Sequence, residues 1–329
     1  MAPALPALYE HGDHSLVLAL VRSHLVNALP LYSTLRTPGY PVHVWATFAA
    51  FDAAGQPVLG TEDDGLWLVL ADLGNQLRFF CSYASHDKLS AEQRARGEEL
   101  VVGALRRYLL EHHNGRDRIS IGAVPDIWTS CISRNLGECF SASTIHWILL
   151  DKLPPVAANG ATVGASVLPG GVVVTEGREE DITEILSTSE VPHPPAYLAT
   201  RLPYTTVLRQ PSATPSASSA GPLASTPPTV LAHCTTHRDG SVGTLHVSPA
   251  HRQRSLGSQV LLARLHAMAS TRPCHEDDGD RNPGAGGYGF CYVHKENEPS
   301  RRLMQRVGMS EQEGEVWWCR VKLPIEELT

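Results

Sequence analysis

Hydrophobic positions in the first half of the chain switch between helical and strand spacing. Helical spacing predicts a helix at 16–29, which Pro30 ends, and a longer helix from Ser90 to about Glu111. Ser90 is a suitable N-cap, although Glu92 lies only two positions later and leaves the capping box imperfect. The remaining hydrophobic segments are predicted strands at 42–51, 65–71, 77–83, 118–124 and 139–150, with a short helix between the last two. These elements indicate a mixed α/β domain.

The second half repeats this alternation and contains two polar interruptions. Predicted strands lie at 172–175, 204–208, 229–235, 241–247, 288–293 and 315–322, and predicted helices lie at 181–187, 194–201, 256–265 and 301–307. Residues 210–228 form a Pro-, Ser- and Ala-rich tract that cannot bury a core, so we expect a disordered insertion between two neighbouring strands. A polar loop at 272–287 is the second interruption. The Pro-, Gly- and Ala-rich stretch 151–171 predicts a boundary between two domains, at 1–155 and 165–329.

Composition is typical of a globular protein and excludes some partners. With 329 residues, 42% of them hydrophobic and 19% charged, the chain is long enough for two domains with cores. The net charge of −7 argues against a general nucleic-acid binder. No apolar run reaches membrane-spanning length, and the N-terminus lacks the blocks of a secretory signal. The seven scattered cysteines predict reduced, mostly buried thiols in an intracellular, cytoplasmic protein.

A short strand, a basic loop and a helix follow one another between Leu245 and Leu265. Pro249 ends the strand because it has no N–H for a sheet ladder. The loop from Arg252 to Gly257 brings backbone N–H groups to a helix N-terminus, where the helix dipole favours an anion. With Arg252 and Arg254 beside it, this loop suits a phosphate or pyrophosphate. A basic loop before a helix is more often a solvated surface loop, so a second motif is needed.

The segment resembles the acyl-CoA-binding motif of the GCN5-related N-acetyltransferase (GNAT) superfamily, in which x-Pro-x-x-Arg-x-x-Gly-x-Gly/Ala joins a strand to a helix. Pro249, Arg252, Leu256 and Gly257 fall in register. Ser255 replaces the usual first glycine, and a serine is strained there if the position needs a positive φ. The resemblance implies that the following residues bind acyl-CoA: Leu245, Val247, Arg252, Gln253, Arg254, Ser255, Leu256, Gly257, Ser258 and Asn297.

A second motif strengthens this resemblance. The strand at 288–293, Asn297, the helix at 301–307 and Gly308 are similar to the late strand–Asn–helix–Gly-Phe pattern of the superfamily, with Met309 in place of Phe. The resemblance implies that Asn297 hydrogen-bonds the pantetheine arm or the thiol end. Asn297 also fits the N-cap of the helix that follows, and it could do both.

The N-terminal half resembles the first module of glycine N-acyltransferase-like proteins, in which only the second of two GNAT-like modules carries the CoA loop. No second Arg-x-x-Gly-x-Gly motif occurs before residue 150. The implied fold is α/β (α+β), with a mixed, mostly antiparallel GNAT-type sheet flanked by helices. A degenerate GNAT-like N-terminal module precedes it.

Catalysis by direct attack of an amine on a thioester needs a base for the ammonium and an acid for the thiolate. The resemblance places Ser241 at the position of the base, where a Glu is usual, and Ser241 could hold a water. Many family members place a Tyr, as the acid, at the position of Met304, which has no proton to donate. Ser300, one turn earlier on the same helix face, could orient the thiolate directly or through water, or else packs at the helix N-terminus. His246 has a suitable pKa, but strand alternation places it on the face opposite Ser241.

Two further histidines, His233 and His237, remain alternatives for the base, although each also fits a structural or solvated role. Cys274, His275, Cys291 and His294 match no regular zinc spacing, so we expect no metal.

The resemblance implies an enzyme that moves an acetyl or other acyl group from acyl-CoA to a primary amine, with a small molecule favoured over a protein. Acyl-CoA is then the co-substrate, and neither nucleic acid nor a membrane is a partner. The alternative is a non-catalytic acyl-CoA-binding protein or interaction scaffold with the same fold, because Ser255, Met304 and Ser241 depart from the family pattern. A loop at Ser255 that still presents its N–H groups inward favours binding. The oligomeric state stays open.

Overall fold

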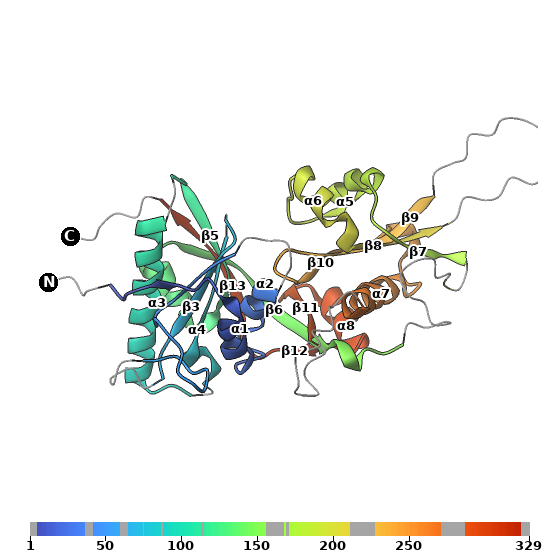
Figure 1. Cartoon of the computed structure of the whole chain (residues 1–329). Coiled ribbons are helices and arrows are strands. Elements are labelled where there is room, and N and C mark those ends of the chain that lie inside the picture. Colours follow the sequence, from blue (N-terminus) through green and yellow to red (C-terminus); the bar gives the residue numbers. More distant parts are fainter. Residues whose placement is uncertain are drawn as a thin grey trace, which may run out of the picture. The chain divides into compact units, whose positions relative to one another are not determined.

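The computed structural model describes residues 5–36, 42–59, 65–74, 76–86, 88–112, 115–155, 168, 171–210, 228–270 and 287–323. Nearly all of the two predicted interruptions, at 210–228 and 272–287, and the predicted boundary at 156–164 lie outside the described residues. The chain forms two compact units (Figure 1). Unit 1 comprises Met1–Ile145, Arg238–Gly240 and Gln312–Thr329, and unit 2 comprises His146–His237 and Ser241–Glu311.

Unit 1 is built around a mostly antiparallel sheet in which the C-terminal strand of the chain is an interior member. Its strands, in spatial order, are β1 (Tyr9–Glu10), β2 (His43–Ala46), β3 (Leu68–Asp72), β4 (Gln76–Cys81), β5 (Arg118–Pro125), β13 (Val316–Lys322) and the first part of β6 (Glu138–Leu149). Only the β4–β5 pair is parallel among these neighbours. β13 therefore completes a sheet whose other strands come from the first half of the sequence.

Helices cover the sheet of unit 1 and explain why β3 is buried at every position. They are α1 (His14–Arg22), α2 (Leu29–Arg36), α3 (Ala91–His112) and α4 (Asp126–Asn135). Leu68 and Leu70 of β3 pack in one core with Leu105 of α3 and Trp128 of α4. α2 contacts β3 and β4. Because successive strand residues point to opposite faces, a strand buried at each position requires cover on both.

Two details of these helices differ from the sequence-based prediction. The single helix predicted at 16–29 is wrong, because α1 ends at Arg22 and Pro30 lies in the first turn of α2 instead of ending a helix. The first turn needs no N–H from proline, so proline is tolerated there. The helix from Ser90 is confirmed, and its capping box is complete with Gln93: Ser90 Oγ accepts from Gln93 N at 3.1 Å, and Gln93 Oε1 accepts from Ser90 N at 3.0 Å.

The cysteines also depart from the expectation of reduced thiols. Cys139 of β6 and Cys319 of β13 are opposite one another in the ladder and form a disulfide. Four other described cysteines are free and buried, as predicted: Cys81, Cys131, Cys234 and Cys291. Two positions 180 residues apart in sequence can pair only because β13 lies beside β6.

Unit 2 contains a four-stranded antiparallel sheet in the order β10 (Val242–Val247), β9 (Thr229–Thr236), β8 (Thr205–Gln210), β7 (Val173–Glu176). α5 (Ile182–Thr188) and α6 (Pro195–Arg201) lie on one face, and α7 (Leu256–Ser270) lies on the other (Figure 1). The unit also holds β11 (Tyr288–His294), α8 (Glu298–Arg306), β12 (Ser310–Glu311) and the end of β6. Short 3₁₀ helices lie at Ser82–Ser85, Leu150–Lys152, Glu179–Asp181, Leu202–Tyr204 and Pro249–His251.

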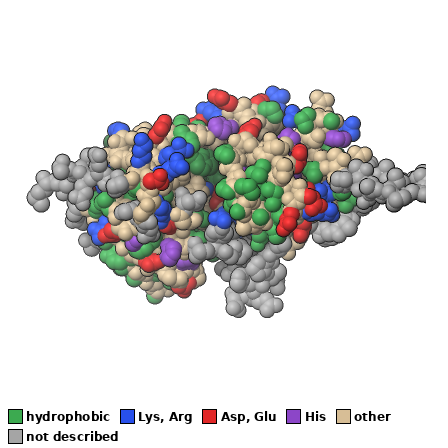
Figure 2. Space-filling model, turned by 90° about the horizontal axis from the view of Figure 1, so that it is seen from above, with side chains coloured by type: hydrophobic (Ala, Val, Ile, Leu, Met, Phe, Trp, Pro, Cys, Tyr) green, Lys and Arg blue, Asp and Glu red, His purple; other side chains and the backbone are tan. Residues whose placement is uncertain are grey.

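The predicted fold class is confirmed, since a mixed, mostly antiparallel sheet in unit 1 and an antiparallel sheet in unit 2 are both flanked by helices. Gly308, at φ +85°, follows the end of α8, as predicted for a helix stop. Lys and Arg side chains are interspersed with Asp and Glu on the face seen in Figure 2. Among the described helices, none has both the length and the apolar character needed to cross a membrane.

A buried ion pair fastens the start of α5 to β8. Arg209 Nη1 donates to Asp181 Oδ1 at 2.8 Å, and the two residues are only 3% and 2% exposed. Asp181 Oδ2 also accepts from the backbone N–H of Arg178 at 2.7 Å, and Arg209 Nε donates to Thr175 at 2.9 Å. Because each nitrogen of the guanidinium and both oxygens of the carboxylate have a hydrogen-bond partner, losing one ion would leave the other buried and unpaired.

We therefore expect Asp181→Ala to lower the free energy of unfolding by about 3 kcal/mol or more. Denaturant titration of the full chain, followed by circular dichroism, measures this change. Glu180→Ala is the matched control: Glu180 is exposed and pairs with Arg178 at 3.4 Å on the surface, so its loss should cost less than ~0.5 kcal/mol. Equal effects of the two variants would contradict the assignment.

Candidate functional site

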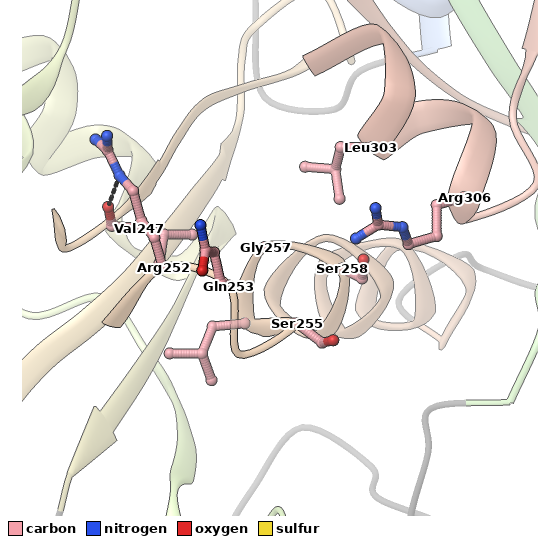
Figure 3. Close-up of a pocket in the computed structure, with 9 residues that line it drawn as sticks. Val247, Arg252, Gln253, Ser255, Gly257, Ser258, Leu303 and Arg306 are labelled. Atoms are coloured by element: carbon pink, nitrogen blue, oxygen red, sulfur yellow. Dashed lines mark hydrogen bonds between the residues drawn. The ribbon is translucent and has the colours of Figure 1, made fainter. Parts of the chain in front are cut away.

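The basic loop and the start of α7 form a pocket of about 170 Å³ in unit 2 (Figure 3). Its lining residues come from the end of β10, the loop, the first turn of α7 and α8: Val247, Arg252, Gln253, Ser255, Leu256, Gly257, Ser258, Leu303 and Arg306. Seven of the ten residues predicted to bind acyl-CoA are among these. Leu245, Arg254 and Asn297 do not line the pocket.

Two lining residues, Leu303 and Arg306, were missed by the sequence analysis. They lie three residues apart on α8, so they share one face of that helix. Arg306 extends from α8 toward Ser258 at the start of α7 (Figure 3). Spacing along α8 marks this face, but only the packing of α8 beside α7 shows that the face reaches the loop.

The pocket suits an anion. Ser255 O accepts from Gln259 N at 3.1 Å and so opens the helical hydrogen-bond pattern. In an α-helix the N–H groups of the first turn, here those of Leu256, Gly257 and Ser258, have no acceptor one turn earlier in the helix. The positive end of the helix dipole lies at the same place. Arg252, whose Nε donates to Val247 O at 3.3 Å, and Arg306 add positive charge. This arrangement can bind phosphate groups.

The strain expected at Ser255 is present. Ser255 has φ +60° and Gln253 has φ +65°, so both lie in the left-handed region that favours glycine. The loop therefore keeps a conformation that a glycine would adopt at lower cost. Gly257 does not have a positive φ, and a Cβ there would lie 3.4 Å from Leu303 and 3.5 Å from Val247, at ordinary contact distance.

β10 has an irregular ladder and a vacant edge. It is the last strand of the four-stranded sheet, so its outer edge has no ladder partner among the described strands. β11, which pairs with β6, lies near this edge. Gly243 pairs with Thr235 and His246 with His233, so β10 has one residue more than β9 between these pairs. This bulge contains Thr244, at φ +44°. Backbone groups on the vacant edge are available to an extended ligand.

The bulge overturns the predicted orientation of His246. Because Thr235 and His233 are two apart on β9, their partners Gly243 and His246 point to the same face of the sheet. His246 thus shares the α5 and α6 face with Ser241, and the prediction that they lie on opposite faces is wrong. Leu245 and Val247 instead pack against the core that includes α7. An inserted residue reverses the alternation beyond it.

His233 and His246 stack on that face, with ring centroids 5.7 Å apart. Burial, followed by the neighbouring His246, lowers the pKa of His233 to about 4. His233 Nε2 lies 3.0 Å from Thr188 Oγ1 of α5, which gives it a structural contact. Burial, followed by Arg252, also lowers the pKa of His246.

The predicted residues Asn297, Ser300 and Ser241 lie in two places, at the start of α8 and just before β10. Asn297 caps α8, with its Oδ1 accepting from Ser300 N at 3.2 Å, so the capping alternative is confirmed. Ser300 lies in the first turn of α8, and Met304 is buried in the core. Ser241, 3% exposed, lies just before β10, and its carbonyl accepts from His237 N at 2.7 Å. Ser241 and Ser300 do not line the anion pocket.

Comparison with known proteins gives likeness in structure but not in sequence. No protein-family model matches the chain, and no curated protein matches it. A solved Drosophila protein matches 98% of this chain and 100% of its own length, at TM-score 0.59 and 13% identity, which shows a shared fold.

Two further solved structures match with lower scores. A tandem GNAT protein from the clavulanic acid biosynthesis pathway covers 98% of this chain and 99% of its own, at TM-score 0.45 and 14% identity. A GCN5-related N-acetyltransferase from Sphaerobacter thermophilus covers 100% and 99%, at TM-score 0.46 and 11% identity. The fold that the chain shares with the Drosophila protein extends over nearly the whole of both chains.

Replacing the strained serine tests the loop conformation. Ser255→Gly removes the cost of a left-handed side chain, about 1 kcal/mol, so we expect unchanged or higher thermal stability. Ser255→Val, with a branched Cβ, should lower stability by more than 1 kcal/mol. Differential scanning calorimetry of both variants measures the effect. A valine variant as stable as the glycine variant would contradict the observed φ.

His233 makes stability depend on pH. The unfolded histidine titrates near pH 6.5 and the folded one near 4, so between these values the unfolded chain binds more protons. The contribution of His233 to stability is therefore fully present above about pH 6.5. As the pH drops to 4, the free energy of unfolding falls by about 3 kcal/mol. His233→Gln should flatten this part of the profile in urea titrations. The exposed His43→Gln is the control, and identical slopes in all three proteins would refute the assignment.

Proposed function

We propose that this chain is an acyl-CoA-dependent N-acyltransferase, which moves an acetyl or other acyl group to a primary amine, most suitably that of a small molecule. The observation that carries the proposal is the continuity of two features in unit 2. The anion pocket at the start of α7 lies at one end of β10, and the vacant edge of β10 leads away from it. Acyl-CoA has the matching chemistry, with phosphates at one end of an extended amide-containing arm.

The pocket would hold the pyrophosphate. N–H groups of Leu256, Gly257 and Ser258 would donate to phosphate oxygens, and Arg252 and Arg306 would pair with their charge. All nine lining residues belong to unit 2. This supports assigning CoA binding to the C-terminal module and a different role to the N-terminal one.

The edge of β10 would hold the pantetheine arm. Amide groups of the arm would pair with the backbone of Leu245 and Val247, as a further strand pairs with a sheet edge. The bulge at Thr244 turns backbone groups out of the ladder with β9, where they can polarise a thioester carbonyl. Asn297, which caps α8 through Oδ1, retains an amide donor for the thiol end of the arm.

Acyl transfer would follow direct attack. The amine nitrogen bonds to the thioester carbon, the carbon–sulfur bond breaks, and the thiolate takes a proton. Ser300, in the first turn of α8, is our candidate for orienting that sulfur, and Ser241 for holding water near the attacking amine. Positive backbone charge at the helix N-terminus of α8 also favours a thiolate.

A second function, acyl-CoA binding without catalysis, has one observation in its favour. Met304 takes the position of the acid and is buried in the core with no proton to donate. A direct-attack reaction can return the proton from water, so the missing acid slows the reaction without forbidding it.

Calorimetric titration with acetyl-CoA tests the proposal. We expect micromolar affinity in the wild type and no binding in Arg252→Ala/Gly257→Asp, because the aspartate places a carboxylate where phosphate should bind. Arg306→Ala should weaken binding about tenfold, the loss of one charge-assisted contact. Arg302→Ala, on the same helix but exposed and paired with Glu298, should change affinity less than twofold.

Two outcomes decide between the candidate functions. No heat from a folded wild type would refute both the enzyme and the acyl-CoA-binding protein. Binding without thiol release from acetyl-CoA across a panel of primary amines would favour the binding protein. Thiol release with any amine, lost in the double variant, would support the transferase.

A further inference from the structure

Three aromatic rings gather on the α5 and α6 face of β10. His193, just before α6, stacks on Tyr197 of α6 with centroids 5.1 Å apart and an interplanar angle of 25°. His237 follows β9, and its ring centroid lies 5.1 Å from that of His193. His237 Nδ1 lies 2.8 Å from the hydroxyl of Tyr197. This ring cluster (His193, Tyr197 and His237) belongs wholly to unit 2.

The ring cluster touches β10 at the residue before its bulge. A Cβ at Gly243 would lie 2.6 Å from His237 Nε2, so the imidazole rests directly on this glycine and any side chain would displace it. Thr244, the bulge residue with φ +44°, comes next. The imidazole therefore lies where the backbone of β10 leaves the ladder.

This position corresponds to the acyl end of the bound thioester, an argument that rests on the proposed function. The phosphates bind beside Val247, and the arm runs back along β10. At a strand rise of about 3.3 Å per residue, Gly243 lies roughly 13 Å from Val247. The thioester thus reaches the bulge. His237 lies beside it, on the face of the sheet that α5 and α6 cover.

The surroundings suit a proton acceptor. Histidine is the side chain whose pKa is matched to proton transfer near neutral pH, and a second group that fixes its ring is the usual arrangement. Tyr197 supplies that contact at Nδ1, and Nε2 is on the side of the ring next to Gly243. Burial lowers the pKa of His193, so the neighbouring ring is neutral near pH 7 and does not repel an ammonium group. The other histidine on this face, His233, has its Nε2 at hydrogen-bond distance from Thr188 Oγ1 instead.

We propose that His237 accepts the proton of the attacking ammonium group through Nε2, and that Tyr197 is its positioning residue. The first proton passes from the ammonium nitrogen to His237, and the nitrogen lone pair forms the bond to the thioester carbon. The carbon–sulfur bond breaks toward sulfur, which takes the second proton from nitrogen. His237 then returns the first proton to solvent, so the amide and free CoA are formed with one proton released.

Two probe amines separate this role from a structural one. Benzylamine is protonated near neutral pH and needs a base, whereas methoxyamine is already neutral and does not. In His237→Gln we expect acetyl transfer from acetyl-CoA to benzylamine to fall at least 100-fold in kcat, and transfer to methoxyamine to fall less than threefold. Tyr197→Phe should reduce the benzylamine reaction about tenfold with little change in KM. Calorimetry should show unchanged acetyl-CoA affinity in both variants.

The exposed His43→Gln in unit 1 is the control and should leave both reactions unchanged. If the wild type is active, equal losses with the two amines in His237→Gln, or no loss with either amine, would overturn the role of His237. The proposed transferase activity would then stand. A folded wild type that binds no acetyl-CoA, or that acetylates neither probe above the rate without protein, would overturn the transferase and this inference together.

Discussion

One extra residue in β10 organises the chemistry of unit 2. Between Gly243 and His246 the strand has three steps where β9 has two, so the ladder breaks at Thr244. The break releases backbone groups that an unbroken strand would use in pairing. It also reverses the alternation of side chains, so His246 joins Gly243 on one face while Val247 packs on the other. Backbone availability and side-chain orientation thus have a single cause.

The helical layer over this face is held by buried polar contacts. The ion pair between Asp181 and Arg209 fixes the start of α5 on β8, and Thr188 at the end of α5 contacts His233. Tyr197 of α6 contacts His237 in turn. A layer fixed by directional bonds holds its rings in one orientation more firmly than apolar packing alone would. Such a layer is suited to proton transfer, which depends on the position of one nitrogen atom.

The anion pocket shows how a departure from a motif can leave geometry intact. Ser255 stands where the motif that the sequence resembles has a glycine, and it adopts φ +60°, while the first residues of α7 line the pocket. The surrounding contacts offset the strain of this left-handed residue, which is of the order of 1 kcal/mol. Replacement of a glycine in such a loop is therefore compatible with the same backbone.

Local sequence determined the elements whose stabilising contacts are close in sequence. Ser90 and Gln93 begin α3 through contacts three residues apart, and the loop before α7 carries its own turn and helix start. Six of the seven pocket residues expected from the sequence lie between Arg252 and Ser258 for this reason. The bulge had only an indirect sign, Gly243 inside a predicted strand, because Thr244, the residue with the positive φ, is neither glycine nor proline.

Tertiary structure decided everything that depends on partners distant in sequence. Arg306 reaches the pocket because α8 packs beside α7, and His237 meets Tyr197 because α6 covers the sheet. β13 enters unit 1 between β5 and β6, which brings Cys319 to Cys139 across 180 residues. The spacing of hydrophobic residues identifies β13 as a strand. It does not show which sheet the strand joins, because the same spacing would suit any sheet with one buried face. The choice of sheet is made by packing and hydrogen bonds to other strands, and these contacts exist only in the folded chain.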